Sequence, residues 1–250
     1  MKPLLDQGIK AVLFDNDGTL VDTKALLLET FHRVLPRVLP GVTFSEQQLV
    51  HGIGKPLEEQ LHEFTSDEAC YEQLLNEYRI VTNQLLESMV RKFDGMDALL
   101  DALHKRGVAL AVVTSKREQP CRVGLRKCGI EHFFNFVVSP DNYTYTKPDA
   151  RPVLHACELL NIAPHQAVFV GDSPYDMMSG TQAGVTTVAV TWGISPRTQI
   201  EEMSKPDYWC ESVDDLSALL FGASDTADTC LLYTSPSPRD RTRSRMPSSA

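Results

Sequence analysis

The chain alternates short apolar runs with segments of helical periodicity, and this alternation restricts its fold more than any other feature. The apolar runs, each of a length suited to one strand, are 9–14, 109–113, 136–138, 167–170 and 187–190. Apolar residues recur at helical spacing within 97–106, 116–128, 149–161 and 174–183. Strands that alternate with helices are typical of βαβ units. We therefore predict an α/β fold with a Rossmann-like, doubly wound parallel sheet, and a ligand site at the carboxyl ends of its strands.

One connection in this pattern is much longer than a crossover requires. No strand pattern occurs between residues 20 and 91, whereas a crossover needs only about a dozen residues or a little more. A helix is expected from about Thr23 to Val38, limited by Pro36 and Pro40. A second helix has an apolar face at spacings of three and four, made of Tyr71, Leu74, Leu75, Tyr78, Val81, Leu85 and Met89. We expect residues 21–91 to form a small alpha-helical cap domain over the strand ends, inserted into a core of residues 1–20 and 92–222.

Composition restricts the partners and the compartment. The 250 residues are 42% hydrophobic and 23% charged, as in an ordinary globular protein. The net charge of −9 argues against nucleic acid as a partner, and no apolar stretch reaches the ~20 residues of a membrane span. The six cysteines form no CxxC pair, so we expect reduced thiols in a cytoplasmic protein. The protein is expected to be a monomer or homodimer without a membrane partner.

The end of the chain differs in composition from the rest. Residues 223–250 are expected to form a disordered tail. From about Cys230 this tail is rich in Ser, Pro and Arg, and it resembles translated sequencing-adapter sequence more than a native terminus. A native basic tail is the alternative. In either case the tail contributes nothing to the functional interpretation.

Polar residues of particular kinds follow the expected strands. They are Asp15 and Asp17 after 9–14, Thr114 and Ser115 after 109–113, Lys147 before a helix, Asp172 after 167–170, and Asp176 one helical turn later. Side chains two apart in a strand point the same way, so Asp15 and Asp17 are expected to lie close together. At ~6 Å and an effective dielectric of ~20 they repel by roughly 3 kcal/mol. With Asp172 and Asp176 they offer the hard oxygen ligands that suit Mg²⁺, which offsets this repulsion.

The same residues suit phosphoryl transfer. The Thr114 hydroxyl and the backbone N–H groups around Gly18 and Thr19 can hold phosphate oxygens. One carboxylate can act as a nucleophile and form an aspartyl-phosphate, and a second can protonate the leaving oxygen and then activate water. We expect Asp15 and Asp17 to divide these two roles.

Four segments, DNDGT, VVTS, KPDARP and VGDSPYD, together resemble the four motifs of the haloacid dehalogenase superfamily, and the resemblance covers about residues 9–220. It implies that Asp15 is the nucleophile and Asp17 the general acid/base, a residue that the superfamily's phosphatases carry and its dehalogenases lack. It further implies that Thr114 binds phosphate, that Lys147 steadies the nucleophile and the phosphate, that Asp172 binds the metal and that Asp176 supports the metal site.

The helical insertion and two further segments, HGIGKPLEEQL at 51–61 and GVTTVAVTWG at 184–193, resemble the phosphoglycolate phosphatase-like branch of this superfamily. The branch implies a Mg²⁺-dependent phosphomonoester hydrolase for a small phosphorylated metabolite, with 2-phosphoglycolate as the first candidate. Ser115 departs from the asparagine frequent in close phosphoglycolate phosphatases, at a position where a substrate contact is expected.

The substrate cannot be read from these motifs, because cap residues set it. Gly52, Gly54 and Lys55 are the expected cap contacts, since the glycines allow close approach and the lysine can meet an anion; a helix start with a solvated lysine is the alternative. A pyrophosphatase, a nucleotidase, and a sugar-phosphate phosphatase or mutase are the alternative enzymes. The non-enzyme alternative is a receiver-type signalling domain, which uses a similar acidic cluster but is about half as long and has no helical insertion.

Overall fold

The computed structural model describes residues 2–222, and its centre is a six-stranded parallel sheet. The strand order is β5-β4-β1-β6-β7-β8. The strands are β1 (Ala11–Phe14), β4 (Ala109–Val113), β5 (Phe136–Val138), β6 (Ala167–Gly171), β7 (Thr186–Val190) and β8 (Tyr208–Cys210). β1 therefore lies in the middle of the sheet, paired with β4 on one side and β6 on the other.

Helices cover both faces of this sheet. On one face, Val12 and Phe14 pack with apolar side chains of α5 (Met96–Lys105), α6 (Glu118–Lys127) and α10 (Val213–Phe221). On the other face, Leu13 packs with side chains of α7 (Arg151–Leu159) and α8 (Pro174–Ala183). Strands buried on both faces read as continuous apolar runs rather than alternating ones. The predicted doubly wound α/β fold is confirmed.

Shorter elements complete the sheet layer. The helix α9 (Arg197–Met203) packs through Ile200 against Met177 of α8 and Ala189 of β7. Within residues 2–222, 3-10 helices lie before β1 at Leu5–Gln7 and in two connections at Glu131–Phe133 and Pro164–Gln166.

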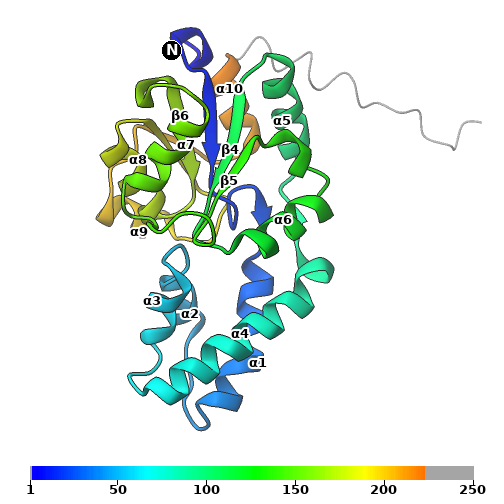
Figure 1. The fold of residues 1–250 in the computed structure, drawn as a ribbon, viewed down its shortest axis with the longest axis vertical. Coiled ribbons are helices and arrows are strands. Elements are labelled where there is room, and N and C mark those ends of the chain that lie inside the picture. Colours follow the sequence, from blue (N-terminus) through cyan, green and yellow to red (C-terminus); the bar gives the residue numbers. More distant parts are fainter. Residues whose placement is uncertain (1, 223–250) are drawn as a thin grey trace, which may run out of the picture.

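Four helices lie between the two short strands β2 (Val21–Asp22) and β3 (Arg91–Lys92), which pair antiparallel with each other. They are α1 (Lys24–Val38), α2 (Glu46–His51), α3 (Leu57–His62) and α4 (Glu68–Met89). Their apolar faces form a hydrophobic cluster of their own, centred on side chains such as Phe31, Leu61 and Leu74. We call residues 23–90 the helical insertion. Figure 1 shows that β1, the blue strand near the N-terminus, runs toward this insertion.

The element boundaries agree with the sequence pattern to within two residues for the four core helices. The first strand is shorter than expected, because it begins at Ala11 rather than at residue 9. Pro36 was expected to limit the first helix, but it lies inside α1. It stands in the last turn of that helix, so it removes one of the final backbone hydrogen bonds and does not break the helix interior.

Two other expectations concern the whole chain. Within residues 2–222, no helix combines the length and the apolar character needed to cross a membrane. The five cysteines of this part of the chain have free thiols, in agreement with the sequence analysis. The expectation for the tail 223–250 lies outside the described residues.

Candidate active site

Three neighbouring strands deliver polar side chains to one edge of the sheet. Asp15 follows β1, Thr114 follows β4 and Asp172 follows β6. The backbone continues the sheet pairing for one further residue at Asp15, whose N–H donates to Val170 O at 2.9 Å. Because the strands are parallel, their carboxyl ends meet at one edge, and these side chains therefore converge.

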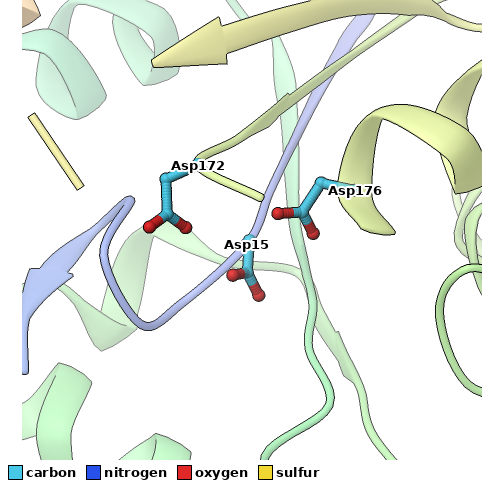
Figure 2. Close-up of side chains that lie close together, drawn as sticks. All are labelled: Asp15, Asp172 and Asp176. Carbon is cyan, nitrogen blue, oxygen red and sulfur yellow. The ribbon is translucent and has the colours of Figure 1, made fainter. Parts of the chain in front are cut away.

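Three buried carboxylates form a compact cluster there. One oxygen from each of Asp15, Asp172 and Asp176 lies within 4.8 Å of the others, and Figure 2 shows the three side chains facing a common space. Asp176 is held in the first turn of α8 by Ser173, whose hydroxyl donates to Asp176 Oδ2 at 2.6 Å and accepts from the Asp176 N–H at 3.3 Å. Two of the three carboxylates thus come from strand ends and the third from a capped helix.

Lys147 is the cation that pairs with this cluster. Its ammonium lies 2.7 Å from Asp15 Oδ1 and 2.5 Å from Asp176 Oδ1, and only 2% of the side chain is exposed. Burial by itself lowers the pKa of Lys147, but the charges of Asp15 and Asp176 outweigh it and raise the pKa above its usual value. Lys147 is therefore a permanent positive charge between two of the three carboxylates.

The single ammonium does not neutralise the cluster. Burial raises the pKa of Asp15 well above its usual value, although Lys147 opposes this, and the nearby Asp176 and Asp172 add to it. Burial and the charge of Asp176 raise the pKa of Asp172 to about 7. Among residues 2–222, no lysine or arginine forms an ion pair with Asp172. A buried charge without a partner is costly, so this corner of the site is suited to a cation.

The loop after β1 positions Asp172. The Thr19 hydroxyl donates to Asp172 Oδ1 at 3.2 Å, and the Ile194 N–H donates to Asp172 Oδ2 at 2.6 Å. Gly18 has a φ of 82° there, and a Cβ at this position would lie 2.1 Å from Asp172 Oδ2, so only glycine fits. Gly18 and Thr19 were expected to bind phosphate; the structure places them against Asp172, and their phosphate contacts stay a prediction.

The carboxylate of Asp17 is not part of the cluster. It was expected to join the metal ligands, but Lys116 binds both of its oxygens, at 2.9 Å to Oδ1 and 3.2 Å to Oδ2. Burial favours a higher pKa for Asp17, but the charge and hydrogen bonds of Lys116 are among the effects that lower it below its usual value. The sequence analysis did not identify Lys116, which directly follows the expected Thr114 and Ser115.

Thr114 and Ser115 are consecutive residues that make different contacts. The Thr114 hydroxyl is buried and accepts the Lys116 N–H at 3.1 Å, which fixes the turn after β4. The Ser115 hydroxyl donates to Gly54 O of the helical insertion at 3.3 Å. Ser115 therefore connects the sheet to the insertion, a contact that was not predicted from the sequence.

A cavity of about 380 Å³ lies between the sheet edge and the helical insertion. The predicted residues that line it are Asp15, Asp17, Gly54, Lys55, Thr114, Ser115, Lys147 and Asp172. The predicted residues Gly18, Thr19, Gly52 and Asp176 lie outside its wall. A Cβ on Gly52 would meet the Gln60 side chain at 2.7 Å, so this glycine serves packing within the insertion.

The insertion contributes two cations to the cavity wall. Lys55 forms an ion pair with Glu63, and Arg79 of α4 donates from Nη2 to Glu58 Oε1 at 2.8 Å. The Nε of Arg79 is buried and has no hydrogen-bond partner among the described residues. A buried donor without an acceptor costs roughly 1–3 kcal/mol. Arg79 also lines the cavity, where an anion would meet its positive charge. The sequence analysis identified Lys55 but not Arg79.

Comparison with known families agrees with this geometry. The family model of haloacid dehalogenase-like hydrolases matches residues 12–190, which include every motif residue of the carboxylate cluster. The chain belongs to this family. The resemblance inferred from the four motifs is confirmed, and the protein is a haloacid dehalogenase-like hydrolase.

Curated relatives span most of the chain. The pyrophosphatase PpaX of Bacillus velezensis is 34% identical over 213 residues, which is 85% of this chain and 97% of that protein. A Clostridium perfringens relative that also carries the PpaX name is 36% identical over 203 residues, 81% of this chain and 93% of its own.

Solved structures share the fold over a similar extent. A protein from Haemophilus somnus described as a predicted phosphoglycolate phosphatase has a TM-score of 0.75 at 26% identity, and the alignment covers 84% of this chain and 96% of that one. A predicted phosphatase from Clostridium acetobutylicum has a TM-score of 0.74 at 26% identity, with 84% and 96% covered.

Proposed function

We propose that the protein is a Mg²⁺-dependent phosphatase that acts on a small phosphorylated metabolite through an aspartyl-phosphate on Asp15. One observation carries the proposal: Lys147 binds both Asp15 and Asp176 in the buried cluster, while Asp172 beside them has no ion-pair partner among residues 2–222. Such a site favours ionised Asp15 once a divalent cation is present, and an ionised carboxylate is what a nucleophile requires.

The residues around Asp15 supply the two half-reactions. In the first, a carboxylate oxygen of Asp15 attacks phosphorus, the bond from phosphorus to the leaving oxygen breaks, and Asp17 gives that oxygen a proton. In the second, Asp17 takes a proton from water as the water oxygen attacks the aspartyl-phosphate, which releases phosphate and restores Asp15. Thr114 and Lys147 line the same cavity and would hold phosphate oxygens through both steps.

The carboxylate cluster fits a magnesium ion. Three buried carboxylates carry three negative charges when ionised, and among the described residues Lys147 is the one cation ion-paired to the cluster, through Asp15 and Asp176. Mg²⁺ prefers hard oxygen ligands of this kind, so Asp15, Asp172 and Asp176 would hold it. When bound, the ion would supply positive charge that stabilises the charge on the transferred phosphoryl group. The Asp17 carboxylate is not included, because Lys116 occupies both of its oxygens.

Inorganic pyrophosphate is the substrate that we propose first. It carries a second anionic group next to the scissile bond, and the cavity wall offers Lys55, Arg79 and Lys116 for that group. The pyrophosphatase names of the curated relatives support this choice. The second candidate is 2-phosphoglycolate, whose carboxylate would meet the same cations; the sequence resemblance favoured it, and a structural neighbour carries the corresponding name. We further propose that the enzyme works in the cytoplasm, in agreement with its free thiols.

Steady-state kinetics on both substrates, with Mg²⁺ and with excess chelator, test the proposal. We expect turnover only with Mg²⁺, and a kcat/KM for pyrophosphate at least about tenfold above that for 2-phosphoglycolate, a difference of ~1.4 kcal/mol. Asp15→Asn should abolish turnover and the acid-trapped phosphoenzyme. The control is Asp94→Asn, which changes an exposed carboxylate between β3 and α5 and should affect neither. Turnover by Asp15→Asn, or activity that persists in chelator, would contradict the mechanism.

A further inference from the structure

The ion pair between Lys116 and Asp17 connects two separate parts of the core. Asp17 belongs to the loop after β1, and Lys116 to the loop between β4 and α6. The Lys116 side chain is 12% exposed and the Asp17 side chain 17%, and both residues line the cavity. Because the ammonium contacts both carboxylate oxygens, a leaving group that approaches Asp17 would have to share each oxygen with Lys116.

A contribution to folding stability does not by itself explain why Lys116 and Asp17 form this ion pair. Partly buried ion pairs contribute little net stability, because desolvation offsets the attraction between the charges. The pair also engages the carboxylate that the proposed mechanism uses as its acid/base. An ammonium has three N–H donors, so Lys116 can bind an anion in the cavity while it still contacts Asp17, and it can then exchange one partner for the other.

We propose that Lys116 is a positioning residue that holds Asp17 aside until a second anionic group of the substrate binds the ammonium. It thereby makes the enzyme selective for substrates that carry an anionic group beside the scissile phosphate. The inference rests on the proposed function, because it takes Asp17 as the acid/base. Its new content is the coupling: recognition of the second anion releases the carboxylate that protonates the leaving oxygen.

The surroundings of the pair favour such an exchange. Arg79 and Lys55 line the same cavity, so a second anionic group can bind there beside Lys116. Arg117, the next residue, forms its own ion pair with Asp141 at 2.8 Å and is not a competing partner for Asp17. Among residues 2–222, Lys116 is the one side chain that forms an ion pair with Asp17. A substrate anion that attracts this ammonium therefore acts on Asp17 directly.

Two substrates separate this role from ordinary phosphate binding. Pyrophosphate carries a second anionic group, whereas ethyl phosphate has a neutral, unactivated leaving group. We expect Lys116→Met to reduce the ratio of their kcat/KM values by roughly tenfold or more, mainly through a higher kcat for ethyl phosphate, because Asp17 is then available without a second anion. Lys116→Arg, which keeps the charge, should retain most of the ratio. Lys127→Met, on the exposed end of α6, is the matched control and should change nothing.

A double-mutant cycle tests whether Lys116 acts through Asp17. If it does, Lys116→Met should change the kcat for ethyl phosphate by less than about twofold once Asp17→Asn is present, so the two effects are not additive. A weaker KM for pyrophosphate in both backgrounds, with no rise in kcat for ethyl phosphate, would show that Lys116 only binds phosphate and would overturn the inference. The proposed function would survive that result. If Asp17→Asn leaves pyrophosphate turnover unchanged, the acid/base assignment fails and the inference with it. Melting temperatures of all variants confirm that each is folded.

Discussion

Replacing Lys147 with methionine tests the charge balance of the buried cluster most directly. The ammonium is 2% exposed and binds Asp15 and Asp176, so Lys147→Met leaves two buried carboxylates without their cation. Removing one partner of a buried pair costs roughly 3–5 kcal/mol. For a protein of this size each kcal/mol lowers Tm by about 2–4 °C, so we expect a drop of roughly 6–20 °C in metal-free protein at pH 7.5.

The pH dependence of this loss identifies its cause. Burial already raises the pKa of Asp15, and Lys147 opposes that rise, so the variant should have a still higher pKa at Asp15. A carboxyl whose pKa is raised in the folded state binds protons more tightly there than in the unfolded chain. Its favourable contribution is present at low pH and is lost as the pH rises toward the folded-state value. The difference in Tm between the wild type and Lys147→Met should therefore be smaller at pH 5 than at pH 7.5.

Thermal unfolding in chelator at the two pH values, and again with Mg²⁺ at pH 7.5, provides the measurement. Mg²⁺ should restore part of the lost Tm, since a ligand at one hundred times its Kd adds ~2.7 kcal/mol to the folded state. Lys205→Met, an exposed lysine near the end of α9, is the control and should keep the wild-type Tm. A Tm for Lys147→Met within about 2 °C of wild type at pH 7.5, or an equal loss at both pH values, would refute this account of the cluster.

Three further outcomes follow from the same geometry. Mg²⁺ should bind more tightly at pH 8 than at pH 6, because it displaces a proton from Asp172, whose pKa is about 7. Titration calorimetry in buffers of different ionisation enthalpy measures the affinity and the number of protons released. Asp17→Asn should slow pyrophosphate hydrolysis by roughly 10²–10⁴-fold but slow an activated aryl phosphate much less, and equal losses would argue against a proton-transfer role. Arg79→Ala should raise the KM for pyrophosphate by about tenfold and leave the KM for ethyl phosphate unchanged, and parallel changes would exclude recognition of the second anion.

The sheet could be predicted from the sequence where its strands are buried on both faces. β1 and β6 are apolar throughout and fully buried, so composition and length alone identified them. β8 lies at the edge of the sheet, and its Tyr208 and Trp209 are only partly buried, so its three residues give no clear pattern. The strands β2 and β3, which bracket the helical insertion, have only two residues each and are too short to show a periodic pattern.

The site could be predicted to the extent that strand ends determine it. Asp15, Thr114 and Asp172 were found because parallel strands place their carboxyl ends together. Lys116 was missed because a lysine in a loop is usually solvated, and only its approach to Asp17, 99 positions earlier, distinguishes it. Arg79 was missed because periodicity on α4 reports which side faces the insertion's own core. It does not report which polar residue faces the sheet across the cavity.

The distribution of charge would explain how an acidic protein selects the proposed anionic substrate. The chain carries a net charge of −9, which by itself repels pyrophosphate. Five cations and four carboxylates line the cavity, and a divalent ion would add two further positive charges. Most of these cations are bound to carboxylates within the protein, as Lys116 is to Asp17 and Arg79 to Glu58. A substrate must therefore exchange these partners rather than meet free charge. Only an anion that reaches several cations at once can offset the cost of separating the pairs, which favours compact substrates with two anionic groups over simple phosphate esters.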